Sequence, residues 1–298
     1  MSPSLAALHA DLAIEYRLAN RSEKTIAWYA GALLSFATYM QRQGYQRCDV
    51  QTFQPRHVNS YILELHAREL SDHSVNSYVR ALRGFSSWLW RKGHTSENRL
   101  ADLRSPKTTS LTLEILSERE VVQLVVAIRQ HSTLATRDEA LLVLMLDTGL
   151  RASEVLSLTM RRMDLAGQRI TVTGKGKKQR ALPIGETTRR AIEQYMRSAH
   201  SARWVFTTDD GRALTVYALK NLFRRMRRWS GIQRVHPHLL RHTFACRWLL
   251  AHNDPLALQT LLGHSSLAMT QHYVKIVAQL RVIESRRATP MDLISLPE

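Results

Sequence analysis

The chain has 298 residues and a formal net charge of +17, from 42 Lys and Arg against 25 Asp and Glu. This excess favours a polyanionic partner, above all nucleic acid, over a solvated basic surface without a function, and no lipidation motif or basic amphipathic anchor supports a membrane surface. The hydrophobic content of 44% excludes a wholly disordered chain, and the length predicts two domains.

The cysteines and the N-terminal residues predict a location inside the cell. Cys48 and Cys246 are far apart and form no C-x-x-C pair, so each is expected to be a buried thiol in a reducing compartment. The first residues lack the basic region of a signal peptide, and the longest apolar run, 140–146, is too short to cross a bilayer. We therefore expect a cytoplasmic protein with no membrane partner.

The first hundred residues predict a compact bundle of four helices. Apolar residues recur at three- and four-residue spacing in four stretches with short connections, near 5–16, 22–44, 57–70 and 74–93. Arg80 and Arg83 lie on a basic polar face of the fourth stretch.

A linker is expected where this periodicity ends. Residues 94–112 are rich in Ser, Thr, Pro and charge and show no apolar repeat. We therefore expect a first, DNA-binding domain that spans residues 1–107, with the linker at its end, and a second domain that spans residues 108–298.

The second domain is predicted to be mostly helical, with one small antiparallel sheet, so the fold class is mainly α. R-I-T-V-T at 169–173 and Q-R-A-L-P-I at 179–184 predict a hairpin around a glycine-bearing turn, and W-V-F-T-T at 204–208 is a candidate third strand. Helices are expected after the capping box S-E-R-E at 117–120, at 138–147, 153–158, 187–197 and 215–229, and from there to the end.

Six polar residues of the second domain have the chemistry needed to attack a phosphodiester without a metal. Arginine forks orient phosphate oxygens, histidine and lysine move protons, and tyrosine can form a covalent intermediate. A phosphotyrosine would conserve the phosphodiester energy when DNA is cut and rejoined without an energy source. The candidates are Arg151 and Arg241 as phosphate clamps, His238 and His264 for hydrogen bonding and proton transfer, Lys175 as general acid and Tyr273 as nucleophile.

A metal site is the first alternative to this interpretation. The sequence has no H-E-x-x-H motif and no cysteine ligand, and Arg241 would repel a divalent cation, so we expect neither a metal nor another cofactor. The histidines that raise the alternative are His236, His238 and His242, with the spacing H-x-H-x-x-x-H, and His264 and His272 downstream.

The combined motifs resemble those of the tyrosine recombinase (phage integrase) family, most closely its short XerC/XerD-like members. The matching stretches are T-G-L-R-A-S-E-V-L-S-L, T-G-K-G-K-K-Q-R-A-L-P-I, H-P-H-L-L-R-H-T-F-A and L-L-G-H-S-S-L-A-M-T-Q-H-Y, and the resemblance covers nearly the whole chain. It implies a SAM-like core-binding domain followed by a catalytic domain. The six active-site positions implied are Arg151, Lys175, His238, Arg241, His264 and Tyr273.

The resemblance also implies a role for Glu154, in R-A-S-E, as an acidic residue that supports the active site. A plain carboxylate on a helix surface is the alternative reading of this residue.

By the same resemblance, the protein is a site-specific DNA recombinase or integrase that serves a chromosome or a mobile element. Tyr273 would cleave one strand at each of two paired core sites, leaving a 3′-phosphotyrosine and a 5′-hydroxyl, and strand exchange would give a Holliday junction. A homotetramer on synapsed DNA, alone or with a second recombinase, would act at the nucleoid. The alternatives are a type IB topoisomerase-like nicking-closing enzyme and a non-catalytic DNA-binding protein on the same fold.

Two helices of the second domain have a second predicted role. The one at 215–229 is amphipathic, and the resemblance implies that its basic face contacts DNA, with a merely solvated face as the alternative. The apolar spacing after Tyr273 predicts a C-terminal helix that either docks on its own domain or, by the resemblance, passes to a neighbouring protomer. The DNA-contact candidates are Lys220, Arg224, Arg227 and Arg228, with Arg80 and Arg83 in the first domain.

Overall fold

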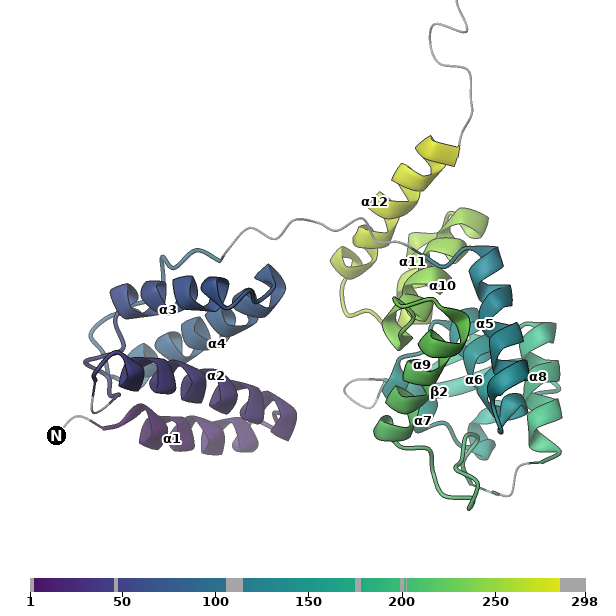
Figure 1. The fold of residues 1–298 in the computed structure, drawn as a ribbon, viewed down its shortest axis with the longest axis horizontal. Helices are drawn as coiled ribbons and strands as arrows, with labels where there is room; N and C mark the ends of the chain where they lie inside the picture. The colour runs from purple at the N-terminus through teal and green to yellow at the C-terminus, as the bar shows by residue number, and fades with distance from the viewer. Residues whose placement is uncertain are drawn as a thin grey trace, which may run out of the picture. The chain divides into compact units, whose positions relative to one another are not determined.

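The computed structural model describes residues 3–45, 48–105, 115–174, 178–198, 201 and 203–284. The chain divides into two compact units, Met1–Leu111 and Thr112–Glu298, and both are mainly helical (Figure 1). The expected domain boundary, between residues 107 and 108, falls in the stretch 106–114, outside the described residues. None of the described helices combines the length and the apolar character that crossing a bilayer requires.

The first unit is a four-helix bundle, as the sequence predicts. Ser4, Ser22 and Ser71 each cap a helix, because the side-chain oxygen accepts a hydrogen bond from a backbone N–H of the first turn. Pro55 begins the remaining helix, at a position where its missing N–H costs nothing. The apolar faces of all four helices share one core. The helices are α1 (Leu5–Leu18), α2 (Glu23–Arg42), α3 (Pro55–Ala67) and α4 (Asp72–Arg91).

The linker does not begin where the periodicity ends, so this part of the prediction is wrong. Leu100 is buried in the core of the first unit. The Ser86 hydroxyl donates to Asn98 Oδ1 at 2.8 Å and accepts from the Leu100 N–H at 3.2 Å, and Arg99 donates to the carbonyl of Val50. These contacts hold an irregular segment that has no helical repeat, which is why its composition alone resembled that of a linker.

The second unit consists of helices packed against a small sheet. Helix α5 begins at the predicted capping box, in which Ser117 Oγ accepts from the Glu120 N–H and Glu120 Oε2 accepts from the Ser117 N–H. Helix α6 ends at Gly149, whose φ of +61° is left-handed. The helices are α5 (Glu118–His131), α6 (Ala135–Thr148), α7 (Ala152–Leu156), α8 (Glu186–Met196), α9 (Val216–Ser230), α10 (Pro237–His252), α11 (Pro255–Leu262) and α12 (Leu267–Glu284).

The sheet is antiparallel and has the strand order β1-β2-β3, with β1 at Met163–Asp164, β2 at Arg169–Thr173 and β3 at Gln179–Pro183. The predicted hairpin is formed by β2 and β3, which pair Val172 with Arg180. The third strand is β1, so the prediction of a strand at 204–208 is wrong. Trp204 and Thr207 make only isolated bridges, with Thr159 and Ala213. A two-residue strand such as β1 is too short to show an alternating pattern.

Two apolar clusters meet on helix α10. Leu239 and Leu240 belong to the larger cluster, which includes residues of α5, α6, α8, α9 and the sheet. Phe244 and Leu249 belong to a smaller cluster with α11 and α12. Arg241 therefore lies on the helix between two regions from which water is excluded.

Candidate active site

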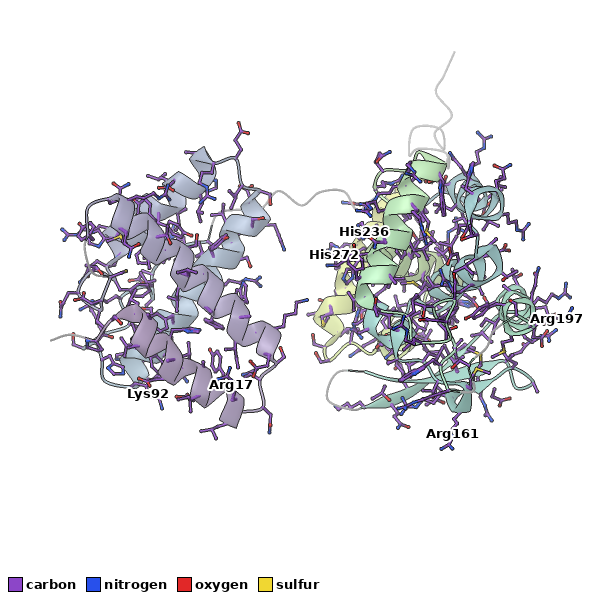
Figure 2. The ribbon with its side chains drawn as sticks, turned by 60° about the horizontal axis from the view of Figure 1, so that its bottom comes forward. Arg17, Lys92, Arg161, Arg197, His236 and His272 are labelled. Atoms are coloured by element: carbon purple, nitrogen blue, oxygen red, sulfur yellow. The ribbon has the colours of Figure 1, made fainter. Side chains whose placement is uncertain are left out.

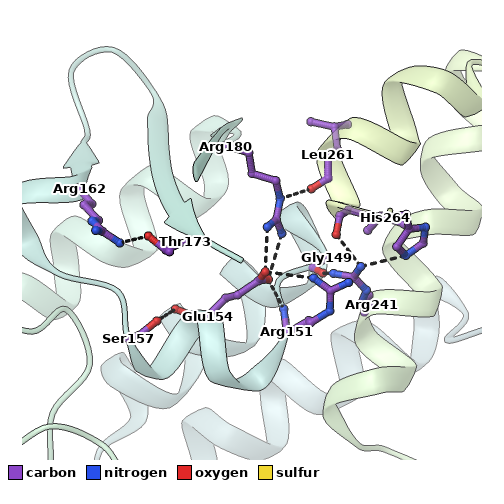
Figure 3. Close-up of polar contacts among 11 residues, drawn as sticks. Gly149, Arg151, Glu154, Ser157, Arg162, Thr173, Arg180, Arg241, Leu261 and His264 are labelled. Atoms are coloured by element: carbon purple, nitrogen blue, oxygen red, sulfur yellow. Dashed lines mark hydrogen bonds and ion pairs between the residues drawn. The ribbon is translucent and has the colours of Figure 1, made fainter. Parts of the chain in front are cut away.

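Arg241 is held inside the second unit by main-chain carbonyls. Its side chain is on α10, and the residue is only 4% exposed. Nη1 donates to the carbonyl of Gly149 at 2.7 Å, and Nη2 donates to the carbonyl of Leu262 at 2.8 Å (Figure 3). Burial, and the positive charge of Arg151, lower the pKa of Arg241 to about 10, so the guanidinium is still charged at neutral pH. Neither carbonyl carries a net charge, so neither neutralises it.

His264 also contacts Arg241 and has a defined tautomer. It follows Gly263, the left-handed residue at the end of α11. Arg241 Nη2 lies 3.1 Å from His264 Nε2 and can only donate, so Nε2 accepts. His264 Nδ1 then carries the hydrogen and donates to Thr270 Oγ1 at 2.9 Å. Burial and the charge of Arg241 lower the pKa of His264 to about 4, so the ring is neutral at pH 7.

Arg151 enters the site from the turn between α6 and α7. Its backbone N–H donates to Glu154 Oε2 at 2.8 Å, and its Nη1 donates to Glu154 Oε1 at 3.2 Å. Its side chain keeps 30% of its surface exposed, so it remains accessible to a ligand. The turn requires Gly149, because a Cβ there would lie 2.4 Å from Cδ1 of Phe244.

Glu154 is buried at 3% exposure, so its interpretation as a surface carboxylate is wrong. Arg180 donates to it through Nη1 at 2.8 Å and Nη2 at 3.0 Å, and through Nε to the carbonyl of Leu261 at 2.7 Å (Figure 3). Burial alone would raise the pKa of Glu154, but the hydrogen bonds from Arg180 and the Arg151 N–H outweigh burial and lower it. The carboxylate is therefore charged and holds two arginines.

Arg180 was not among the predicted site residues. The sequence did contain a signal for it, because Arg180 and Leu182 lie two apart on one strand and so share a face, and Leu182 is apolar. The arginine therefore faces the protein interior, where a charge needs a partner.

Tyr273 lies on α12 with 4% exposure. Its ring is nearly parallel to that of His264, with centroids 6.2 Å apart and an interplanar angle of 8°. Its Oη lies 2.8 Å from Nδ1 of His242, a residue whose spacing in the sequence suggested only a metal ligand. Burial raises the pKa of Tyr273, and the positive charge of Arg241 opposes that rise. The phenol is therefore neutral at pH 7.

Of the two remaining predicted residues, the structure describes His238. It is exposed at the start of α10, with its ring centroid 6.5 Å from that of His236. Lys175 lies outside the described residues. The structure thus brings together Arg151, Arg241, His264 and Tyr273.

The predicted basic faces are exposed. On α9, Lys220, Arg224 and Arg228 are exposed and Arg227 is half-buried, while the opposite stripe of Leu219, Leu222, Phe223 and Met226 is buried. On α4 of the first unit, Arg80 and Arg83 are both exposed. Over the ranges that the structure describes, no three His, Cys, Asp or Glu side chains are grouped so as to hold a metal ion.

Comparison with known proteins identifies the family. The phage integrase family matches residues 114–279, and the phage integrase N-terminal SAM-like domain matches residues 11–93. A tyrosine recombinase XerC from Oceanobacillus iheyensis is 32% identical over 281 residues, which cover 90% of this chain and 92% of that protein. One from Bacillus subtilis is 30% identical over 271 residues, 88% of each chain.

Solved structures share the fold at lower identity. A XerH site-specific recombinase bound to a palindromic difH substrate has a TM-score of 0.72 and 20% identity, over 90% of this chain and 81% of that one. A lambda integrase dimer bound to a COC′ core site has a TM-score of 0.75 and 16% identity, over 99% and 100% of the two chains. The chain therefore belongs to the phage integrase family of tyrosine recombinases and is a site-specific DNA recombinase.

Proposed function

We propose that this recombinase cleaves and rejoins double-stranded DNA through a covalent 3′-phosphotyrosine on Tyr273, without a metal or another cofactor. The observation that carries the proposal is the position of Arg241, a buried arginine whose hydrogen-bond partners among the described residues are uncharged, in the same site as a buried tyrosine. A buried positive charge without a carboxylate partner favours an anionic ligand. A phosphodiester is the anion that suits a DNA recombinase.

The free hydrogens of Arg241 support its role as a phosphate clamp. A guanidinium has five N–H groups, and the contacts with Gly149, Leu262 and His264 use three of them. The N–H groups that remain are available to Tyr273, which also receives a hydrogen bond from Arg241, and to a phosphate oxygen. Arg151 supplies a second guanidinium whose orientation Glu154 controls. Because these donors are held before substrate binds, they would stabilise the charge that develops on the phosphorane oxygens.

The other roles follow from the chemistry of each residue. Tyr273 attacks phosphorus, Lys175 protonates the departing 5′-oxygen, and His238 supplies a hydrogen bond or a proton to the phosphate. His264, whose one N–H donates to Thr270, keeps the Arg241 guanidinium in one orientation. Lys175 is assigned by its motif alone.

DNA is the partner that the surface charge supports. The exposed arginines and Lys220 of α9, and Arg80 and Arg83 of α4, would contact the duplex from the two units. We further propose that two protomers bind each core site, that a homotetramer forms on two synapsed sites and exchanges strands through a Holliday junction, with or without a second recombinase, and that the protein is nucleoid-associated in the cytoplasm.

The test is the formation of an SDS-resistant protein–DNA adduct. Nicked suicide duplexes from DNA flanking the gene are incubated with the protein in EDTA, and the modified peptide is identified by mass spectrometry. We expect an adduct on Tyr273 that is absent from Tyr273→Phe. The matched control is Tyr217→Phe, because Tyr217 is 73% exposed on α9 and should leave the adduct intact. An adduct that persists in Tyr273→Phe would disprove the assignment of the nucleophile.

A relaxation assay separates recombination from type IB topoisomerase-like activity. A nicking-closing enzyme would relax supercoiled plasmid that lacks a core site, whereas the proposed recombinase requires paired sites and yields Holliday junctions. Normal DNA binding without any adduct would instead support the non-catalytic alternative.

A further inference from the structure

His242 contacts the atom of Tyr273 that would attack DNA, yet none of the roles above uses it. It follows Arg241 on α10, and its half-buried ring lies 5.4 Å from that of Tyr273, at an angle of 49°. The distance from Nδ1 to Oη is 2.8 Å, which is a hydrogen bond of normal length.

The direction of this hydrogen bond follows from the protonation of both partners. Burial, with the neighbouring charges of His238, His272, His236 and Arg241, lowers the pKa of His242 to about 4. The ring is therefore neutral at pH 7, and one of its nitrogens is a free acceptor. Figure 2 shows His236, the residue that caps the start of α10, and His272 of α12 at the same side of the second unit.

The phenol needs an acceptor for its hydrogen, because a buried hydroxyl without one is costly. In the part of the chain that the structure describes, His242 Nδ1 is the acceptor found at Oη. Arg241, the other polar group whose charge acts strongly on Tyr273, can only donate. Tyr273 Oη therefore donates to Nδ1, and Nε2 of His242 carries the ring hydrogen.

We propose that His242 is a further catalytic residue, which accepts the phenolic hydrogen of Tyr273 when Tyr273 attacks DNA. This inference rests on the proposed covalent mechanism. As the Oη–P bond forms and the bond from phosphorus to the 5′-oxygen breaks, the hydrogen of Oη moves to Nδ1 and gives an imidazolium. The 5′-oxygen takes its proton from the general acid, assigned to Lys175. In rejoining, the 5′-hydroxyl returns its proton to the general acid as it attacks phosphorus, the Oη–P bond breaks, and His242 returns its proton to Oη.

Bound DNA would make His242 a stronger base than it is in the free protein. Its basicity is low because burial and positive neighbours disfavour the imidazolium. A phosphodiester held by Arg151 and Arg241 adds a negative charge nearby, which favours the imidazolium. Proton acceptance is thereby coupled to the presence of the substrate, and an unbound enzyme keeps its nucleophile protonated.

The decisive variants differ in where they place an acceptor. His242→Asn puts an amide oxygen near the position of Nδ1, His242→Gln extends it toward the position of Nε2, and His242→Phe keeps the ring but removes both nitrogens. The control is His252→Asn, a change of the exposed histidine that ends α10, whose ring packs against Trp248.

The rate of adduct formation on the suicide duplex is measured in a single turnover, with the Kd for the same duplex and the Tm of each variant. We expect a loss of roughly 100-fold or more in rate for all three His242 variants, because an amide oxygen accepts a hydrogen bond but cannot take up the proton, and no change in His252→Asn. Kd should be unchanged throughout. A wild-type rate in His242→Phe or in His242→Asn would overturn the proposal.

A second measurement needs no DNA and keeps this inference separate from the covalent mechanism. Tyrosine labelled with ¹³C at Cζ gives an NMR signal for Tyr273, identified by its loss in Tyr273→Phe. We expect His242→Phe to shift this signal and His252→Asn to leave it in place, because only the first removes the acceptor. An unshifted signal in His242→Phe would refute the hydrogen bond even if no adduct forms in any variant.

Discussion

Arg180 and Glu154 are joined by two hydrogen bonds, of 2.8 and 3.0 Å, inside the second unit. The same guanidinium donates through Nε to the carbonyl of Leu261, near the end of α11. Arg180 therefore ties strand β3 to α7 and α11. Residues proposed for catalysis border two of these elements: Arg151 directly precedes α7, and His264 follows the end of α11.

Loss of Arg180 should therefore destabilise the protein and disorder the site. In Arg180→Gln the buried Glu154 loses its principal partner, and removing one member of a buried pair costs about 3–5 kcal/mol. Urea unfolding measures the loss, and adduct formation should fall with it. The matched control, Arg190→Gln, breaks an ion pair to Glu186 in which Arg190 is 74% exposed. That change should cost less than about 1 kcal/mol, and equal losses in both variants would contradict the role of Arg180.

Stability should increase with pH between about 4 and 6.5, because the folded protein keeps His264 neutral. Its pKa is about 4 when folded and near 6.5 when unfolded, so between these values the unfolded state binds the additional proton. Each such group contributes a slope of about 1.4 kcal/mol per pH unit within that range. His264→Gln should reduce the slope of the unfolding free energy against pH by about 1.4 kcal/mol per pH unit, which is the contribution of one proton. An unchanged slope would mean that the ring is not held neutral.

Gly149 should tolerate alanine less well than another left-handed glycine does. Both Gly149 and Gly231 end helices, with φ of +61° and +73°, but an added Cβ has no neighbour within 4 Å at Gly231 and meets Phe244 at 2.4 Å at Gly149. Gly231→Ala should cost about 1 kcal/mol from backbone strain. Gly149→Ala should cost roughly 1–3 kcal/mol more, because it also overpacks the core and moves the carbonyl that holds Arg241. Thermal unfolding of the pair gives the comparison.

The basic face of α9 should determine how steeply DNA binding depends on salt. If Arg224 and Arg228 neutralise phosphates, Arg224→Gln and Arg228→Gln should each reduce the slope of log K against log salt by about 1. Fluorescence anisotropy with a duplex at several salt concentrations measures the slope. Arg190→Gln, which removes the same charge from α8, is the control. Equal reductions in all three variants would indicate a general charge effect instead of contact by α9.

The sequence predicted the elements because their signals are local. Serine caps, the capping box at Ser117 and apolar repeats at helical spacing lie within a few residues of the helices that they specify. The fold class, the four-helix bundle and the hairpin were confirmed on that basis. The irregular segment around Leu100 was misread because contacts with Val50 and Ser86, distant in the chain, hold it without a repeat. The two-residue strand β1 was missed because it is too short to show an alternating pattern.

Motifs predicted which residue types carry the chemistry, and the tertiary structure decided what each one contacts. Arg241, His264 and Tyr273 lie on α10, after α11 and on α12, and they meet only because these helices pack together. The burial of Glu154, its pairing with Arg180 and the hydrogen bond from Tyr273 to His242 join residues far apart in the chain. Such contacts produce no periodic pattern of residue types in the sequence. They form when the chain folds, because burying a charge or a hydroxyl without a partner is costly.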